Sequence, residues 1–309
     1  MRSPDLSYHS IVCVKQVPDT ANITVDAMKA DGTVNRGALP AIFNPEDLHA
    51  LEAALAVRDA HGGTVTAITM GPLSATEVLR DCLYRGADRG VLINDRRAAA
   101  SDTLATSYII NQAIRKIADY DLIFCGRQAI DGDTAQVGPQ VAEKLGIPQI
   151  TYVEHIVELD GRNARLRRNV GNGWEVVEAR LPLLLTVLDT ANRPRPASAR
   201  RVMRAKRARS AAEVEREVKA AMKDADDAAR EKEITQRIDT LAAKGLLFDQ
   251  FDLDDIDADL AWCGIAGSPT KVHRVQSIVL TKEGFKEVEP TEQGVRDMIH
   301  ELIHDHTLG

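Results

Sequence analysis

Residues 121–145 decide the fold. The apolar run Asp121-Leu122-Ile123-Phe124 is followed by the loop CGRQAIDGDTAQVGP at residues 125–139 and then by a helical run at residues 140–145. The apolar run predicts a buried strand. A loop that carries glycine and hydroxyl groups between a strand and a helix is where α/β sheets bind phosphate, because the first N–H groups of a helix are unpaired and its dipole favours an anion. We therefore expect residues 125–139 to cradle the phosphates of a nucleotide or flavin nucleotide.

Strand and helix signals alternate over the first 150 residues. The runs at residues 10–14, 64–70, 90–93 and 121–124 are apolar and rich in β-branched residues, which predicts buried strands. Continuous apolar strands separated by helices predict an α/β fold, with an open, mainly parallel sheet and helices on both faces.

Three local patterns predict where the intervening helices begin. Asn44-Pro45-Glu46-Asp47 offers an N-cap, a proline in the first turn and two acids at the positive end of the helix dipole. Ser74-x-x-Glu77 has the spacing of a capping box. Ser101-Asp102-Thr103 precedes a third helix with apolar residues at helical spacing.

The pattern changes after residue 150. Residues 155–159 and 164–168 flank a turn and predict a β-hairpin, residues 174–179 could add an antiparallel strand, and residues 183–188 predict a buried strand that returns to the main sheet. Residues 211–244 are highly charged and lack glycine and proline; they suit either a solvated helix or a partner contact. We expect an α/β nucleotide-binding domain at 1–209, a charged helical insertion at 210–250 and a C-terminal arm at 251–309 that packs on another subunit.

Composition excludes several classes of protein. The net charge of −7 over 309 residues argues against a nucleic-acid partner. No apolar run approaches the roughly 20 residues that span a bilayer, and no secretory signal is visible after Met1. The four cysteines lie far apart in the sequence, which favours free thiols and a cytoplasmic location. We find no GxxxxGK[ST] loop, GxGxxG fingerprint, GxSxG elbow, HExxH motif or Cys/His metal cluster.

Four segments fall at the carboxyl ends of predicted parallel strands, at residues 15–18, 70–72, 94–103 and 125–139. Ligands of open α/β sheets bind at that edge. The hydroxyls of Thr103 and Thr106 could supplement N–H donors to phosphate, although Ser101 and Thr103 could simply cap a helix. Asp131 and Asp133 suit a metal or a general base, but in such a loop they more often form turns. The sequence therefore predicts a cofactor-binding protein without acid–base chemistry of its own.

The chain resembles the β subunit of electron transfer flavoproteins over about residues 8–209 and 262–275. The resemblance rests on collinear motifs: Val14-Lys15-Gln16-Val17-Pro18-Asp19-Thr20, Asn44-Pro45-Glu46-Asp47, Met70-Gly71-Pro72, Gly86-Ala87-Asp88-Arg89, Gly126-Arg127-Gln128-Ala129-Ile130-Asp131-Gly132-Asp133, Leu181-Pro182, Asn192-x-Pro194-Arg195, Met203-x-Ala205-Lys206 and Gly267-Ser268-Pro269-Thr270-Lys271-Val272.

The resemblance implies a heterodimer with an α subunit that holds a flavin in a mobile domain. In the respiratory branch of the family the β subunit binds AMP, and in the bifurcating branch it binds a second FAD, with NADH docking nearby. Residues 100–107 and 133–139 resemble the bifurcating branch. The respiratory branch has Asn and Thr at the positions of Ala135 and Val137, which cannot donate side-chain hydrogen bonds to AMP phosphate. This comparison favours FAD, with AMP as the alternative.

The resemblance also suggests which residues form the sites. The backbone near Cys13, Asn44 and Met70 would contact adenine and ribose, while Thr103, Thr106 and the loop would contact phosphates. The expected cofactor-binding loop residues are Gly126, Arg127, Gln128, Asp131, Gly132, Asp133, Thr134, Ala135, Gln136, Val137 and Gly138.

The partner-recognition loop departs from the family. Pro196 and Ala199 stand where the family usually has Tyr and a Leu anchor, and Ala199 is too small to fill a pocket on a partner. The dehydrogenase partner could therefore differ, or docking could use the helical stretch at 211–244 instead.

We therefore expect an electron carrier. It would pass electrons between NADH or an acyl-CoA dehydrogenase-like flavoprotein and the α-subunit flavin, with ferredoxin or a quinone reductase as further partners and electron bifurcation as one mode of action. Two alternatives stay open: the same family with structural AMP and no flavin in this subunit, and a stand-alone adenine-nucleotide-binding protein.

Overall fold

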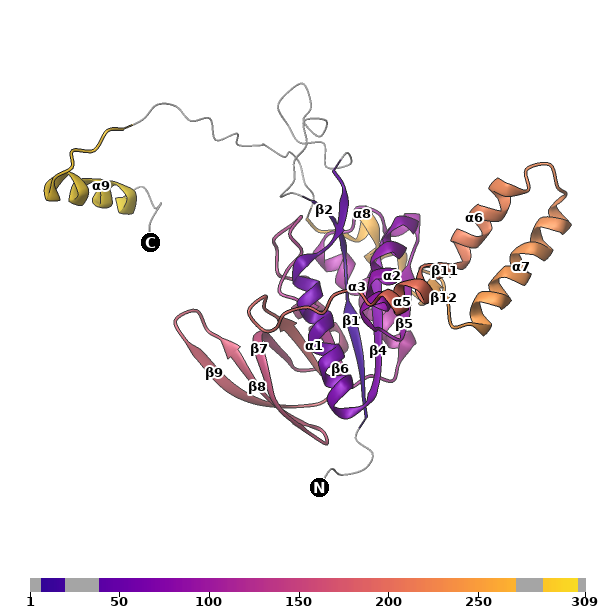
Figure 1. Cartoon of the computed structure of the whole chain (residues 1–309), viewed down its shortest axis with the longest axis horizontal. Helices are drawn as coiled ribbons and strands as arrows, with labels where there is room; N and C mark the ends of the chain where they lie inside the picture. The colour runs from indigo at the N-terminus through magenta and orange to yellow at the C-terminus, as the bar shows by residue number, and fades with distance from the viewer. Residues whose placement is uncertain (1–6, 20–38, 271–285, 305–309) are drawn as a thin grey trace.

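The computed structural model describes residues 7–19, 39–270 and 286–304 (Figure 1). Its centre is a ten-stranded sheet in the order β11-β12-β5-β4-β1-β6-β10-β7-β8-β9. Every neighbouring pair from β11 to β7 is parallel, and β7, β8 and β9 continue the sheet as antiparallel neighbours. The strands are β1 (Tyr8–Cys13), β4 (Gly63–Met70), β5 (Arg89–Ile93), β6 (Leu122–Gly126), β7 (Gln149–Asp160), β8 (Asn163–Asn169), β9 (Trp174–Arg180), β10 (Leu183–Val187), β11 (Arg209–Ser210) and β12 (Leu247–Phe251), with β2 (Gln16–Pro18) and β3 (Ala41–Phe43) as a separate antiparallel pair.

Helices cover both faces of this sheet, as the sequence predicted. Alternate residues of β6 show why: Leu122 and Phe124 belong to one buried cluster, while Ile123 and Cys125 belong to another. The first cluster includes residues of α1 and α2, and the second includes residues of α3 and α4. The helices are α1 (Pro45–His61), α2 (Thr76–Arg85), α3 (Thr103–Ile117), α4 (Val137–Leu145), α5 (Ala199–Ala205), α6 (Ala211–Ala221), α7 (Asp227–Ala243), α8 (Gly264–Gly267) and α9 (Glu292–His304).

Of the predicted helix starts, the one at Asn44 is confirmed in position and the one at Ser74 is not. Asn44 is the N-cap residue of α1, but its side chain makes no capping hydrogen bond. The predicted capping box at Ser74 is wrong: Leu73–Ala75 form a 3₁₀ turn, and α2 begins at Thr76 without a side-chain cap. Glu77 instead pairs with Arg80, 2.8 Å away. An i,i+3 pair inside α2 thus uses the glutamate that the local pattern had assigned to the helix end.

The segment at 210–250 is only partly helical. α6 and α7 form a hairpin that projects from the sheet, at the right of Figure 1, and the strand β12 follows it. β12 pairs with β5 and so extends the main sheet, which the sequence analysis did not predict. Phe248 of β12 packs over Gly90, where an added Cβ would lie 2.7 Å from the ring. The glycine in β5 therefore makes room for a strand that is distant in sequence.

The first part of the predicted C-terminal arm packs on this chain's own core. Leu253, Ile256 and Cys263 are buried in the cluster that includes α3 and α4. The arm also includes residues 271–285 and 305–309, which lie outside the described residues. Its packing on another subunit stays a prediction. In the described parts of the chain, no helix has both the length and the apolar character needed to cross a membrane.

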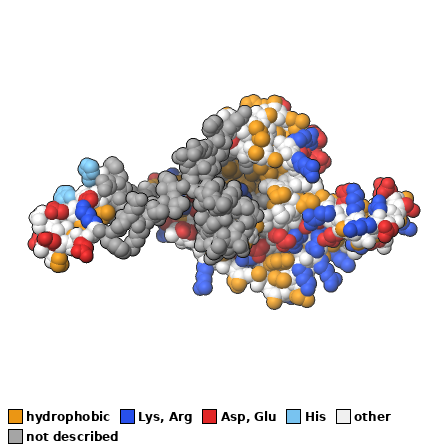
Figure 2. Space-filling model, turned by 90° about the horizontal axis from the view of Figure 1, so that it is seen from above, with side chains coloured by type: hydrophobic (Ala, Val, Ile, Leu, Met, Phe, Trp, Pro, Cys, Tyr) orange, Lys and Arg blue, Asp and Glu red, His pale blue; other side chains and the backbone are white. Residues whose placement is uncertain are grey.

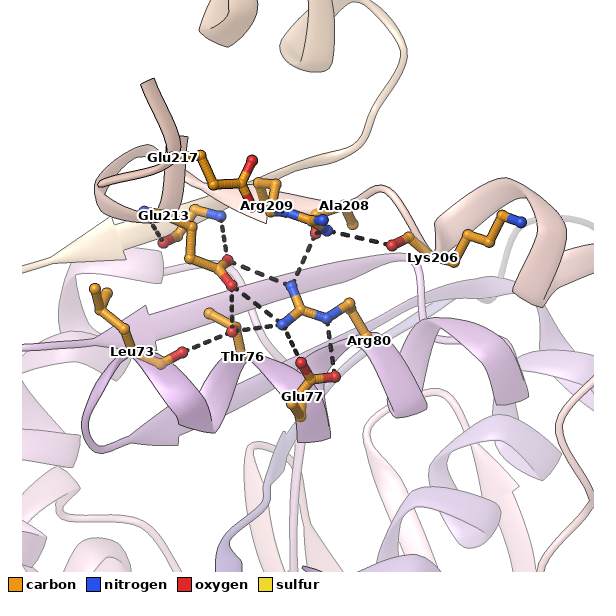
Figure 3. Close-up of polar contacts among 10 residues, drawn as sticks. Leu73, Thr76, Glu77, Arg80, Lys206, Ala208, Arg209, Glu213 and Glu217 are labelled. Carbon is orange, nitrogen blue, oxygen red and sulfur yellow. Dashed lines mark hydrogen bonds and ion pairs between the residues drawn. The ribbon is translucent and has the colours of Figure 1, made fainter. Parts of the chain in front are cut away.

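A buried ion pair joins the helical hairpin to the body of the domain (Figure 3). The Arg80 guanidinium on α2 lies 3.1 Å from the Glu213 carboxylate on α6, and their side chains are 6% and 5% exposed. Arg80 also donates to the carbonyl of Ala208 at 2.9 Å. Ser210 and Glu213 form the capping box that begins α6. One glutamate therefore both starts the helix and fixes it to α2.

Replacing Glu213 with alanine should lower the free energy of unfolding by roughly 3 kcal/mol, because the Arg80 charge would stay buried with only Glu77 as its carboxylate partner. Urea unfolding followed by circular dichroism measures the change. Glu217→Ala is the matched control, since Glu217 makes an exposed pair with Arg209, and its loss should cost less than about 1 kcal/mol. Equal effects of the two substitutions would contradict the role assigned to Glu213.

Candidate nucleotide-binding site

The predicted site segments meet at one edge of the sheet. Cys13, Met70 and Gly126 are the last residues of β1, β4 and β6, three strands that lie side by side and run parallel. At the neighbouring strand end, Asn94 donates its side-chain N–H to the carbonyl of Gly71 at 2.9 Å. The structure thus confirms that strand ends far apart in sequence form a single carboxyl edge, where open α/β sheets bind ligands.

The start of α1 holds the loop that follows β6. The Asn44 side chain donates to the carbonyl of Gln128 at 2.9 Å and accepts from the N–H of Ile130 at 3.2 Å. Asn44 is fully buried, so both bonds are made away from solvent. The asparagine that the sequence analysis assigned to capping therefore fixes the backbone of the predicted phosphate loop.

The two acids after Asn44 act on the same strand end and loop. Glu46 accepts from the Arg127 guanidinium at 2.6 Å and from the N–H of Gln128 at 3.2 Å. Asp47 accepts from the N–H of Lys15 at 2.9 Å and from the N–H of Gly126. An added Cβ at Gly126 would lie 2.5 Å from Oδ1 of Asp47, so only glycine allows this close approach. We call Asn44, Glu46 and Asp47 the polar clamp.

The end of the loop has an unusual backbone. Asp133 and Ala135 have φ angles of 49° and 52°, the left-handed region that residues other than glycine rarely adopt. Gln136 then has right-handed angles, and α4 begins at Val137. A change of handedness between neighbouring residues turns successive N–H groups toward one concavity, which suits an anion. Strained backbone of this kind is found at functional sites.

The start of α3 reaches this concavity. The hydroxyl of Thr103 donates to the side-chain carbonyl of Gln136 at 2.8 Å, which brings α3 and the loop together. Asp102 is the N-cap, and its carboxylate accepts from the N–H of Ala105. Thr106 lies in the same first turn and is half-buried. Both threonines therefore stand where they could contact a phosphate, and capping belongs to Asp102.

Other side chains bind the loop together. Lys15 and Asp131 form an ion pair at 2.7 Å, and the Gln128 amide donates to Asp133 at 2.9 Å. These contacts give the two aspartates structural partners within the site. Gly132 and Thr134 are exposed, Val137 is half-buried, and Gly138 is buried in the first turn of α4.

The structure adds two residues that the site prediction omitted. The hydroxyl of Ser268 accepts from the N–H of Asp102 at 2.8 Å. Thr270 donates its hydroxyl to the Asp102 carboxylate at 2.6 Å. They belong to the Gly267-Ser268-Pro269-Thr270 motif, which the sequence analysis used for the family resemblance without placing it in space. Its position beside the start of α3 required the tertiary structure.

The two residues predicted to bind a partner lie on the helical layer and not at the sheet edge. Pro196 and Ala199 are exposed at the start of α5, which packs on α2. Arg195 holds this segment to α1 through Glu52, with Nε 2.8 Å from the carboxylate. The segment is thus fixed on the helical layer, and the phosphate loop lies at the sheet edge.

Burial has a strong effect on the clamp carboxylate Asp47. Desolvation raises its pKa from 3.8 to about 7, and hydrogen bonds from Asn44, Lys15 and Gly126 limit the rise. The side chain of Glu46 beside it keeps the Arg127 guanidinium as an ion-pair partner. One of the two neighbouring acids is thus neutralised by an arginine, and the other depends mainly on backbone N–H groups.

The model of the electron transfer flavoprotein domain matches residues 31–222. The chain is 40% identical over 298 residues to the electron transfer flavoprotein subunit beta of Clostridium acetobutylicum, covering 96% of this chain and 99% of that protein. This chain belongs to the electron transfer flavoprotein β-subunit family. It is also 42% identical over 302 residues to protein FixA of Bradyrhizobium diazoefficiens, covering 96% and 91% of the two chains.

A third relative is subunit CarD of the caffeyl-CoA reductase–Etf complex of Acetobacterium woodii, 47% identical over 186 residues, or 60% of this chain and 70% of CarD. Members of the electron transfer flavoprotein β family transfer electrons and pair with an α subunit. The fold of this chain, a mainly parallel sheet flanked by helices, agrees with that family.

Replacing Asp47 with asparagine should remove a pH dependence from the stability of this β subunit. Its raised pKa means that the folded state binds the proton more tightly than the unfolded state, so the contribution of Asp47 to the free energy of unfolding falls as the pH rises from about 4 to about 7. The fall is at most roughly 4 kcal/mol. Asp47→Asn should flatten the curve, measured by urea unfolding across that range. The control Asp249→Asn, at an exposed pair with Arg89, should keep the wild-type curve. An Asp47→Asn curve that keeps the full wild-type change over this range would refute this.

Proposed function

We propose that this chain is the β subunit of a heterodimeric electron transfer flavoprotein and binds FAD at the carboxyl edge of its sheet. It would pass electrons between NADH or an acyl-CoA dehydrogenase-like flavoprotein and the α-subunit flavin, by flavin-based bifurcation. The observation that carries the proposal is the left-handed Ala135 directly before the start of α4, which Thr103 of α3 joins through its hydrogen bond to Gln136.

The site suits the two charged groups of a diphosphate better than it suits a ligand with a single phosphate. Two helix starts, those of α3 and α4, supply N–H donors and positive dipole ends. The link between Thr103 and Gln136 keeps these starts side by side. The loop is half-buried or exposed over residues 127–137, so a large dinucleotide could enter without unfolding the loop.

The residues in the loop favour FAD over AMP. Ala135 and Val137 have no side-chain donors for the phosphate that the respiratory branch binds with Asn and Thr at these positions. Phosphate binding here must therefore rely on backbone N–H groups and on Thr103 and Thr106. The name of the relative CarD places it in a caffeyl-CoA reductase–Etf complex, which supports a role beyond the respiratory branch.

When bound, FAD would supply the redox chemistry, and the residues of this chain would position it. The polar clamp holds the loop backbone, and the glycines at 126 and 138 keep side chains out of the sheet edge. In the described residues no group of three or more His, Cys, Asp or Glu could hold a metal ion.

The projecting α6–α7 hairpin is the proposed docking surface for the dehydrogenase partner. α7 has no buried residue, and Figure 2 shows positive and negative side chains interleaved over the hairpin at the right. Ala199 is too small to act as an anchor in a pocket of the partner. Docking would therefore use a second surface, and the hairpin supplies one. Ferredoxin or a quinone reductase would be the further acceptor.

The proposal predicts two flavins per heterodimer after co-purification with the α subunit. Denaturation, flavin chromatography and nucleotide analysis count them. Thr103→Val should weaken retention of the second flavin about 10-fold or more, because a hydrogen bond to a charged group contributes roughly 1.5–3 kcal/mol. Thr240→Val is the control, since this threonine bonds only its own helix, at Gln236.

One flavin with one AMP would overturn the FAD proposal and keep the family. A stable monomer that binds an adenine nucleotide without the α subunit would instead support the stand-alone alternative.

The hairpin proposal predicts that the triple variant Glu231→Ala, Lys232→Ala, Asp239→Ala transfers electrons to its dehydrogenase partner several-fold more slowly at low salt, because exposed charges steer association. Stopped-flow spectroscopy of flavin reduction measures the rate. Reduction by NADH should be unchanged and serves as the internal control. A wild-type rate with the dehydrogenase at every salt concentration would exclude the outer face of α7 as the docking surface. Deletion of the whole hairpin is a poorer test, because it removes Glu213 from Arg80.

A further inference from the structure

Two cysteines lie side by side at the edge of the sheet. Val12 of β1 is paired with Phe124 of β6, so Cys13 and Cys125 occupy the next position on two neighbouring parallel strands. Residues paired in this way point to the same face, and both cysteines belong to the cluster that includes α3 and α4. The Cys13 side chain is close enough to Cys125 to raise the pKa of its thiol. Both are free thiols in the structure.

The two thiols differ in access. Cys13 is half-buried at the end of β1, while Cys125 is only 6% exposed. The contact with Cys13 and burial together raise the pKa of Cys125. The other two cysteines are not on this strand pair: Cys82 is buried in the cluster on the opposite face, and Cys263 immediately precedes α8. Cys13 is thus the accessible member of the pair, and Cys125 is its neighbour within reach.

The spacing of neighbouring strands suits a bond between them. Strands lie about 4.8 Å apart, within the range of about 4.4–6.8 Å that disulfides span between Cα atoms. Facing Cβ atoms on parallel strands are somewhat further apart than disulfides prefer, and disulfides formed under such strain are the readily reduced ones.

We propose that Cys13 and Cys125 form a redox-active dithiol, which a hydroperoxide converts into a reversible disulfide at the edge of the nucleotide site. The Cys13 thiolate attacks one peroxide oxygen; an S–O bond forms, the O–O bond breaks, and the leaving hydroxide takes a proton to become water. The Cys125 sulfur then attacks the resulting sulfenic acid; an S–S bond forms, the S–O bond breaks, and a second water leaves with the Cys125 proton. Two electrons pass from the thiols to the peroxide.

The disulfide would act on the cofactor site, an effect that rests on the proposed function. Cys125 leads directly into Gly126 and the phosphate loop. The Cys125 sulfur also lies 3.5 Å from the position of a Cβ at Gly138, in the first turn of α4. Rotation of this sulfur toward Cys13 would therefore alter the packing under both ends of the loop. Oxidation should weaken nucleotide binding, and reduction should restore it.

Peptide mapping of the purified heterodimer tests the dithiol. Treatment with hydrogen peroxide should link the peptides that contain Cys13 and Cys125, and dithiothreitol should separate them. Cys125→Ala and Cys13→Ser should each abolish the linked peptide. Cys263→Ala, which removes a buried thiol outside the β1–β6 strand pair, should keep it. An unlinked pair after peroxide treatment, whether Cys13 stays a thiol or is oxidised to sulfinic acid, would overturn the proposal.

The amount of nucleotide retained after gel filtration tests the effect on the cofactor site separately from the formation of the disulfide. Oxidised wild type and Cys263→Ala should each retain several-fold less nucleotide than their reduced forms, while Cys125→Ala should not respond to peroxide. A linked peptide with unchanged retention would refute the effect on the cofactor site and leave the dithiol in place. A linked peptide in a protein that binds no nucleotide in either state would instead refute the proposed function.

Discussion

The polar clamp at the start of α1 is the interaction on which the site depends. Asn44, Glu46 and Asp47 direct their side chains away from their own helix and toward β1, β6 and the loop after β6. A long loop at a sheet edge has many backbone groups without regular partners, and buried groups of this kind must be paired. The backbone of Gln128 and Ile130 is thereby held by residues more than 80 positions away. The left-handed residues at the loop end persist because this frame holds them.

The same edge brings different kinds of chemistry together. The starts of α3 and α4 offer N–H donors, the clamp buries a carboxyl with a raised pKa, and two thiols face each other beneath the loop. The buried carboxyl, bonded after β1 and at the end of β6, and the thiol pair both depend on these strands being neighbours in a parallel sheet. A change at this strand pair would therefore affect the nucleotide loop, the pH dependence of stability and the proposed dithiol at once.

The hairpin of α6 and α7 is held in place by different interactions from those at the site. It contributes little to the core, yet its root is the buried pair of Arg80 and Glu213, and the strand that follows it extends the main sheet. Such an arrangement holds an exposed, charged element at a constant position relative to the domain. This is what a docking surface requires, since a mobile hairpin would lose more conformational entropy when a partner binds.

The sequence by itself determined the parallel α/β class, most strand positions and the place of the loop at residues 125–139 between a strand and a helix. These features follow from local patterns, because apolar runs must be buried and helix starts need particular residues. The tertiary structure alone decided what Asn44, Glu46 and Asp47 bind, since the same side chains suit a local cap or a distant partner equally well. It also decided that β12 joins the sheet and that Cys13 meets Cys125. Strand neighbours are set by the packing of the whole chain, and no local pattern encodes them.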